Sequence, residues 1–186
     1  MTTFENEKFK LEIENDEFPI NPRENDNLSE MICFQNRYNL GDAHNYQSND
    51  FSGWDEMKKG ILKSKNPAII LPLHLYDHSG ITISTIPFTC RWDSGQVGYV
   101  LVTKEKVYSE YKVKRITKKL IEKINRIILC EVEEYDNFIS DNVYSYNLLN
   151  KNTCEEDSCG GFYGSDIKKN GMLDYIGIEA VNSLAL

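Results

Sequence analysis

Two polar turns hold the side chains that could carry out chemistry in this sequence. In the first, Asp77, His78 and Ser79 are adjacent, and these residue types form the triad of serine hydrolases when their side chains converge. Adjacent residues of one turn point in different directions, so the tripeptide favours a turn in which Asp77 and Ser79 bond their own backbone. A catalytic site would therefore need further residues from elsewhere in the chain.

A cysteine in the second turn supplies another candidate nucleophile. Cys159 lies in the segment DSCGGFYG, and a cysteine beside a histidine is a nucleophile pair. Its glycine neighbours also fit a turn with positive φ, in which the thiol is buried and inert. The enzyme alternative is thus a small hydrolase-like site of His78, Asp77 and Cys159 in the turns at 77–94 and 157–164.

The sequence favours neither a metal nor a cofactor. His74 and His78 are four residues apart and would share one face of a strand, where Cys90 or Asp93 could complete a zinc site. The chain has only three histidines, however, and its five cysteines contain no CxxC pair. Phosphate-loop and dinucleotide fingerprints are absent, and the glycines of WDSGQVG fit a tight turn. We therefore expect no metal and no cofactor.

Apolar periodicity predicts the elements that must position these turns. The strongest signal is a stripe at the 3.6-residue period over 117–139, which predicts a long amphipathic helix with Thr117 as its N-cap. A second helix is expected at 53–63 with Ser52 as its cap. Successive strands with one long helix indicate an α+β fold, a single domain over residues 1–186 in which that helix packs on a mainly antiparallel sheet of five or more strands. Strands are predicted at 9–13, 31–34, 68–76, 81–85, 97–103, 143–148 and 162–163, and a last short helix at 172–181.

Charge is distributed unevenly along the chain. The formal net charge of −8 disfavours direct binding to DNA or to anionic membrane surfaces. Residues 104–126 nevertheless hold nine cations against three acids, whereas residues 1–30 hold nine acids against three cations and residues 131–157 hold eight acids against one cation. Such runs usually form solvated faces that balance one another within the fold. The alternative is that the acidic runs form a surface that binds a basic partner.

The sequence gives no indication of secretion or membrane insertion. Its first residues, MTTFENEKFK, lack the basic region and apolar run of a signal peptide, and no apolar stretch approaches the length of a membrane span. An odd number of cysteines at irregular spacings fits reduced thiols better than a disulfide framework. We therefore expect a cytoplasmic protein.

Six long motifs occur in order between Pro22 and Gly164. They are PRENDNL, ICFQNRYNLGD, LPLHLYDHSGITI, CRWDSGQVGYVLV, EVEEYDNFISDNVYSY and DSCGGFYG. Together they resemble a family of uncharacterised proteins found mostly in phages and other mobile elements. The sequence departs from that family's pattern at Asn25 and Gly160, where tryptophan is usual, so a binding face built by those tryptophans would be altered here.

The resemblance implies a phage or prophage setting in the cytoplasm of a bacterial host. Small acidic phage proteins often act in counter-defence, where antirestriction and anti-CRISPR proteins imitate the charge of a nucleic acid and occupy a basic cleft. We therefore expect a non-enzymatic inhibitor of a host defence protein or ribonucleoprotein complex. The basic 104–126 segment would then pair with acids internally or contact guide RNA in the same complex. The expected partner-binding residues are Glu12, Glu14, Asp16, Glu17, Glu133, Glu134, Asp136 and Asp141.

Overall fold

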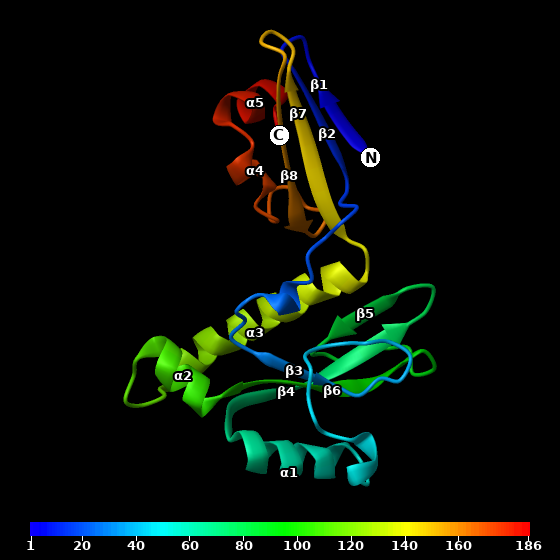
Figure 1. Ribbon diagram of the computed structural model, residues 1–186, viewed down its shortest axis with the longest axis vertical. Coiled ribbons are helices and arrows are strands. Elements are labelled where there is room, and N and C mark those ends of the chain that lie inside the picture. Colours follow the sequence, from blue (N-terminus) through cyan, green and yellow to red (C-terminus); the bar gives the residue numbers. More distant parts are fainter. The chain divides into compact units, whose positions relative to one another are not determined.

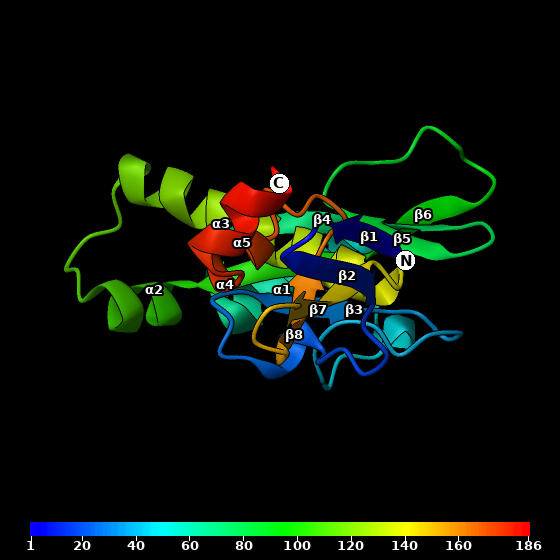
Figure 2. The ribbon, with the colours of Figure 1, turned by 90° about the horizontal axis from the view of Figure 1, so that it is seen from above.

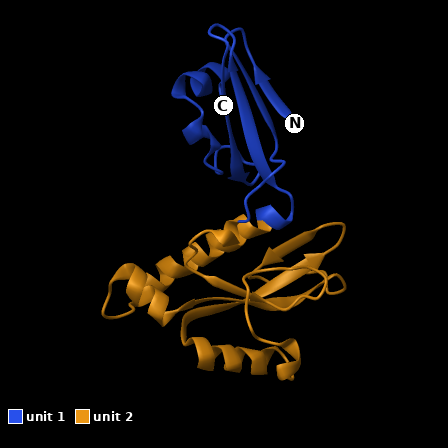
Figure 3. Ribbon diagram, viewed as in Figure 1, with its two compact units in different colours: residues 1–21, 137–186 blue, residues 22–136 orange.

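The computed structural model describes residues 1–186, which form two compact units (Figure 3). Unit 1 comprises residues 1–21 and 137–186, and unit 2 comprises residues 22–136. Unit 2 is therefore inserted in the sequence between the two segments of unit 1, and each unit has its own sheet. The single domain expected over residues 1–186 stays a prediction. None of the helices has the length and apolar character that crossing a membrane requires.

Unit 1 is a four-stranded antiparallel sheet with two short helices on one face (Figure 1). Its elements are β1 (Thr2–Glu5), β2 (Phe9–Asn15), β7 (Val143–Asn150), β8 (Glu155–Tyr163), α4 (Met172–Tyr175) and α5 (Ile178–Leu184), with the strand order β1-β2-β7-β8. Successive side chains of a strand point to opposite faces. In β2, Phe9, Leu11 and Ile13 are accordingly buried in one core with the apolar residues of α4 and α5, whereas Lys10 and Glu12 face outward.

Unit 2 is a second four-stranded antiparallel sheet, ordered β3-β6-β4-β5, with helices on both faces (Figure 1). Helix α1 packs on one face, where Met57 and Ile61 join Ile32, Tyr99 and Leu101 in a buried cluster. Helix α3 covers the other face, and its last three residues belong to unit 1. The elements are η1 (Pro22–Glu24), β3 (Glu30–Cys33), η2 (Ser48–Asp50), α1 (Trp54–Lys65), β4 (Pro67–Asp77), β5 (Ile81–Ser84), β6 (Ser94–Thr103), α2 (Lys104–Tyr111) and α3 (Lys118–Ile139).

The predicted α+β class, the antiparallel pairing and the long helix are confirmed. The hydroxyl of Thr117 accepts a hydrogen bond from the Leu120 backbone N–H at 3.3 Å, as expected of a helix cap. The buried stripe of α3 follows the predicted spacing, because residues three and four apart share a helix face. Its fully or nearly buried members are Ile124, Ile128, Val132 and Tyr135.

Several finer predictions were wrong. The strands form two sheets of four instead of one larger sheet, because alternation specifies the buried face of a strand but not its neighbours. Ser52 does not cap α1: Gly53 holds that position, and the Ser52 hydroxyl donates to the Glu56 carboxylate at 2.6 Å. The strand expected at 162–163 begins earlier, at Glu155. The helix expected at 172–181 is divided into α4 and α5.

A buried ion network joins the first residues of unit 2 to α3. The Arg23 side chain is 4% exposed, and its Nε and Nη2 donate to the two carboxylate oxygens of Asp42 at 2.9 and 2.6 Å. Nη2 also donates to the Ser29 carbonyl at 2.7 Å, and Nη1 lies 3.7 Å from a carboxylate oxygen of Glu131. Glu131, on α3, accepts hydrogen bonds from the backbone N–H groups of Leu28 and Ser29 at 2.7 and 3.0 Å. One guanidinium thus holds three segments together.

We expect the variant Arg23→Met to destabilise unit 2 strongly. It leaves two largely buried carboxylates without their cation, and breaking a buried ion pair from one side costs about 3–5 kcal/mol. The matched control Lys106→Met removes a pair with Asp26, whose side chain is 91% exposed, and should cost less than about 1 kcal/mol. Urea unfolding followed by circular dichroism measures both free energies, and equal losses would contradict the importance of the network.

Candidate functional site

Two of the polar segments noted in the sequence meet at one end of the unit 2 sheet. The end of β4 and the start of β6 are adjacent there, since Tyr76 pairs with Ser94 and the Asp77 backbone N–H donates to the Asp93 carbonyl at 2.8 Å. A pocket of about 320 Å³ lies between these strands and the segment after β3. Its polar lining comes from Gln35, Asp77, Asp93, Ser94 and Gln96, and its aromatic lining from Phe34 and Trp92.

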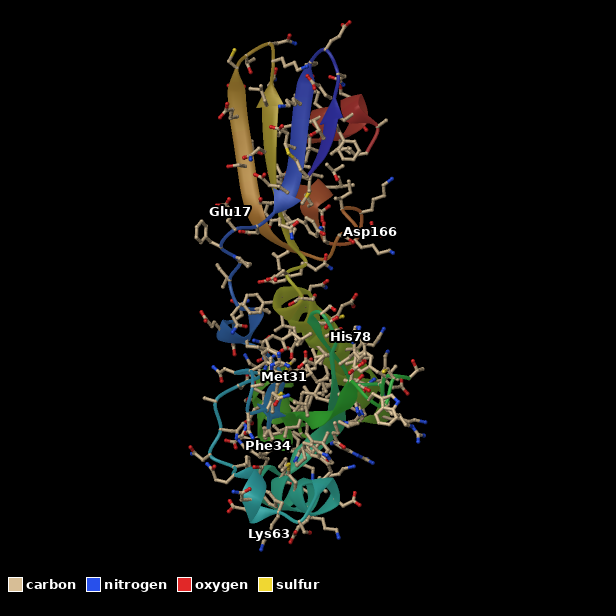
Figure 4. The ribbon with its side chains drawn as sticks, turned by 90° about the vertical axis from the view of Figure 1, so that its right-hand side faces the viewer. Glu17, Met31, Phe34, Lys63, His78 and Asp166 are labelled. Carbon is tan, nitrogen blue, oxygen red and sulfur yellow. The ribbon has the colours of Figure 1, made fainter.

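His78, which Figure 4 labels, forms an acid–base pair with Asp93 beside this pocket. The His78 Nδ1 lies 3.2 Å from the Asp93 Oδ2, and the Tyr76 ring stacks on the imidazole with centroids 6.0 Å apart. The Cys90 thiol lies 3.7 Å from the same carboxylate oxygen. The histidine is therefore oriented by a carboxylate and a ring. It remains 63% exposed, and no hydroxyl or thiol bonds its imidazole.

Asp77 has a structural partner that the sequence did not predict. Its carboxylate accepts hydrogen bonds from the Arg37 Nη1 at 3.0 Å and from the Tyr38 hydroxyl at 3.2 Å. It therefore fixes the segment after β3, which corrects the expectation that it bonds its own turn. That turn closes without it, because Ser79 adopts a positive φ of 59° and the His78 N–H bonds a backbone carbonyl at 3.0 Å.

Cys159 lies in unit 1, whereas Asp77 and His78 lie in unit 2, so neither unit by itself assembles the three residues of the enzyme alternative. The Cys159 Sγ is 3.7 Å from the carbonyl oxygen of its neighbour Gly160. All five cysteines are free. No cluster of three or more His, Cys, Asp or Glu side chains is arranged to hold a metal ion. Burial lowers the pKa of His74, the other histidine of this region.

The acidic residues expected to bind a partner divide between the two units. In unit 2, the Asp136 carboxylate accepts hydrogen bonds from the Thr82 hydroxyl and the Ile83 N–H at 2.6 and 2.7 Å, so it fastens β5 to α3. Burial and then the charges of Glu131 and Glu133 raise the pKa of Glu134. Unit 1 holds Glu12, Glu14, Asp16, Glu17 and Asp141, and unit 2 holds Glu133, Glu134 and Asp136.

Two of the unit 1 acids also have local partners. Asp16 accepts a hydrogen bond from the Gly161 N–H at 2.8 Å, and a side chain at Gly160 would collide with it, since an added Cβ would lie 2.4 Å from the Asp16 carboxylate. A tryptophan at Gly160 would therefore require Asp16 to move. Glu12 forms an ion pair with Lys10 at 2.7 Å. Only part of the predicted acidic set is thus free to meet a partner.

Counting charges by unit shows a pattern that the charged runs at 1–30, 104–126 and 131–157 do not show. Unit 1 contains thirteen Asp and Glu against five Lys and no Arg, a formal charge of −8, whereas unit 2 contains sixteen acids and sixteen cations. Register places Glu14 and Glu156, together with the ion-paired Glu5 and Glu12, on the face of the unit 1 sheet opposite α4 and α5. Lys10 is the one cation of these strands on that face. Glu5 and Glu156 were not among the predicted residues.

No family model, no curated protein and no solved structure matches the chain. The resemblance to a phage-associated family stays a prediction, and the arguments for function rest on geometry and charge.

The buried thiol of Cys33 predicts how unit 2 responds to alkali. Burial raises its pKa from 9.0 to about 12. The Cys33 thiol ionises at a higher pH in the folded chain than in the unfolded chain. The stability that the neutral thiol contributes is therefore complete below pH 9 and is lost as the pH rises towards 12. The lost stability approaches about 1.4 kcal/mol per pH unit within that window.

We expect Cys33→Ala to lose stability less steeply above pH 9 than the unaltered chain. The matched control is Cys130→Ala, which removes an exposed thiol of α3 and should keep the original slope. Urea unfolding under reducing conditions on either side of pH 9 measures the slopes. Identical slopes in the two variants would show that Cys33 does not titrate as inferred.

Proposed function

We propose that this chain is a non-enzymatic, phage-encoded counter-defence protein of the anti-CRISPR or antirestriction type. In this proposal its acidic unit 1 occupies a basic groove on a host defence protein or ribonucleoprotein complex. The observation that carries the proposal is the placement of the whole formal charge of −8 on unit 1, while unit 2 is neutral. The phage setting comes from the motif resemblance.

The outer face of the unit 1 sheet is the contact surface that fits this role. Glu14 and Glu156 are exposed and form no ion pair, and no element of unit 1 covers the face on which they lie. A sheet face with a surplus of acids complements the basic surface of a nucleic-acid-binding protein. Such complementarity speeds association and weakens as salt screens the charges.

A hydrolase-like enzyme is the second candidate, and one observation favours it. The His78 imidazole lies 3.2 Å from the Asp93 carboxylate beside an open pocket, which is the geometry of an oriented general base. Against it, the Asp77 carboxylate is engaged by Arg37 and Tyr38. The site also lacks a nucleophile bonded to the imidazole, so the binding role has the better support.

We expect the tagged full chain to capture a host nuclease or CRISPR component, identified by mass spectrometry, from lysate of its bacterial host with or without nuclease treatment. The complex should dissociate near 1 M salt, where the Debye length falls to about 3 Å. The variant Glu14→Lys with Glu156→Lys should reduce capture at least about tenfold, since reversed charges at a contact cost several kcal/mol.

The matched control is Glu7→Lys with Asp174→Lys, which makes the same charge change at exposed positions of unit 1 outside the outer face. Capture should persist in this control. Equal loss in both variants would attribute binding to net charge and refute the assignment of the outer face, and failure to capture any defence component would defeat the proposal.

We expect the purified chain to hydrolyse an activated ester no faster than its His78→Ala variant, because no nucleophile is bonded to the imidazole. A chromogenic acyl ester followed by absorbance is the measurement. Turnover that disappears in His78→Ala and also in Cys90→Ala or Cys159→Ala would favour the enzyme over the binding protein.

A further inference from the structure

A concentrated basic surface lies at the other end of unit 2 from the His78 pair. It covers the loop between α2 and α3 and the first turns of α3, which stand apart from the β4–β5 and β5–β6 connections (Figure 2). Seven cations lie within fifteen residues there, with Glu122 as the one acid among them. We call this the basic surface, and its cations are Lys112, Lys114, Arg115, Lys118, Lys119, Lys123 and Arg126.

None of these seven cations forms an ion pair within the protein. All are exposed, and none lies within ion-pair distance of an acid. Cations elsewhere in unit 2 do find acids: Lys106 pairs with Asp26 at 2.9 Å and Lys65 with Glu30 at 2.7 Å. Internal pairing with acids was one role expected of the 104–126 segment. The residues of this segment from Lys112 onwards form no such pairs.

The basic surface is also hollowed. A pocket of about 340 Å³ lies between the loop and α3, with Arg115, Lys119, Lys123 and Arg126 in its walls. The last three lie at spacings of four and three residues, on one helix face, over roughly 10 Å of the axis. Tyr111, Val113 and Leu120 add aromatic and aliphatic area to the lining. The Lys123 ammonium lies over the Tyr111 ring, 5.0 Å from its centroid.

We infer that the basic surface binds a single strand of nucleic acid through its phosphate backbone. A row of cations along a groove matches the repeating charge of a strand, and an aromatic and aliphatic floor accepts an unstacked base. The positive end of α3 adds to the same field. The bases of a duplex are stacked inside it and cannot contact this apolar lining. The geometry therefore favours a single strand.

The net charge of the chain does not prevent this binding. Charges separated by more than a Debye length, about 8 Å at physiological ionic strength, are largely screened, so local charges matter most to a bound phosphate. Locally, the seven cations outnumber the three acids Glu122, Glu131 and Glu134 that line pockets beside Lys123 and Arg126. The inference departs from the expectation of no direct nucleic-acid binding that the total charge suggested. It does not rest on the proposed function, because it concerns other residues in the other unit.

Fluorescence anisotropy of the purified full chain tests the inference. The probes are labelled oligouridylate and oligothymidylate of about 12 nucleotides, within the range that single-strand sites cover. We expect saturable binding near 50 mM salt, with log K falling by about 0.7 per neutralised phosphate for each unit of log salt. Lys119→Gln with Lys123→Gln and Arg126→Gln should weaken binding at least about tenfold and make the salt slope shallower by about 2.

The matched control removes the same charge from α1, by Lys58→Gln with Lys59→Gln and Lys63→Gln, at exposed positions that form no ion pair (Figure 4 labels Lys63). This control should bind within about twofold of the unaltered chain, because those lysines make no phosphate contact. Thermal unfolding by circular dichroism confirms that both variants fold. A second variant, Lys112→Gln with Lys114→Gln and Arg115→Gln, should weaken binding in the same direction.

Three outcomes would overturn the inference. They are absence of binding to both strands, equal loss in the α1 control, and binding to a duplex of matched sequence or to polyglutamate as tight as binding to the single strand. Preference for uridylate or for thymidylate leaves the inference standing and identifies the strand as RNA or DNA. Capture of a defence component in the absence of any oligonucleotide binding would leave the proposed function intact while this inference falls.

Discussion

A buried guanidinium must be surrounded by acceptors, and this requirement organises unit 2. The Nε and Nη2 of Arg23 meet it through Asp42 and the Ser29 carbonyl, and Nη1 lies 3.7 Å from Glu131 of α3. The loop that carries Asp42 is fixed further by the Gly41 N–H, which donates to the Tyr135 hydroxyl of α3 at 2.8 Å. Gly41 has a φ of 72°, and an added Cβ would lie 2.6 Å from a backbone oxygen of β3, so only glycine fits there. The apolar stripe of α3 supplies buried area, and these polar contacts join the helix to the segments at 23–29 and 41–42.

The two units use charge in different ways. In unit 2, equal numbers of acids and cations are sorted in space, with ion pairs formed within the fold and a run of cations left unpaired at one end. In unit 1, acids exceed cations, and four of them, Glu5, Glu12, Glu14 and Glu156, lie on the sheet face opposite the core that α4 and α5 share. One acidic chain therefore carries an acidic sheet face on unit 1 and a basic surface on unit 2.

The pocket beside the end of β4 and the start of β6 shows why rare residue types in a turn do not amount to a catalytic site. Asp77 stabilises the segment after β3, and His78 is oriented at the surface. The Asp93 carboxylate contacts the His78 imidazole, and Asp93 also lines the pocket. A hydrolytic centre that works through a covalent intermediate requires a nucleophile, a base and an orienting group in one bonded series. Here the base and the orienting group meet without the nucleophile, so the geometry supports a structural or binding role for these turns.

The sequence by itself determined α3, whose burial follows the helical period, and β4 and β6, which are continuous apolar runs, and it determined the antiparallel α+β class. The tertiary structure decided which strands share a sheet, because the alternation of apolar and polar residues along a strand does not depend on which strand lies beside it. It also decided the elements with weak apolar signals: α2 buries only Val107, and β8 begins with a polar run that pairs at the edge of its sheet. Hydrogen-bond partners such as Asp77 with Arg37, or Asp136 with Thr82, lie 40 and 54 residues apart, and no local spacing encodes them. The concentration of the whole net charge on unit 1 likewise emerged only when the fold joined the two ends of the chain.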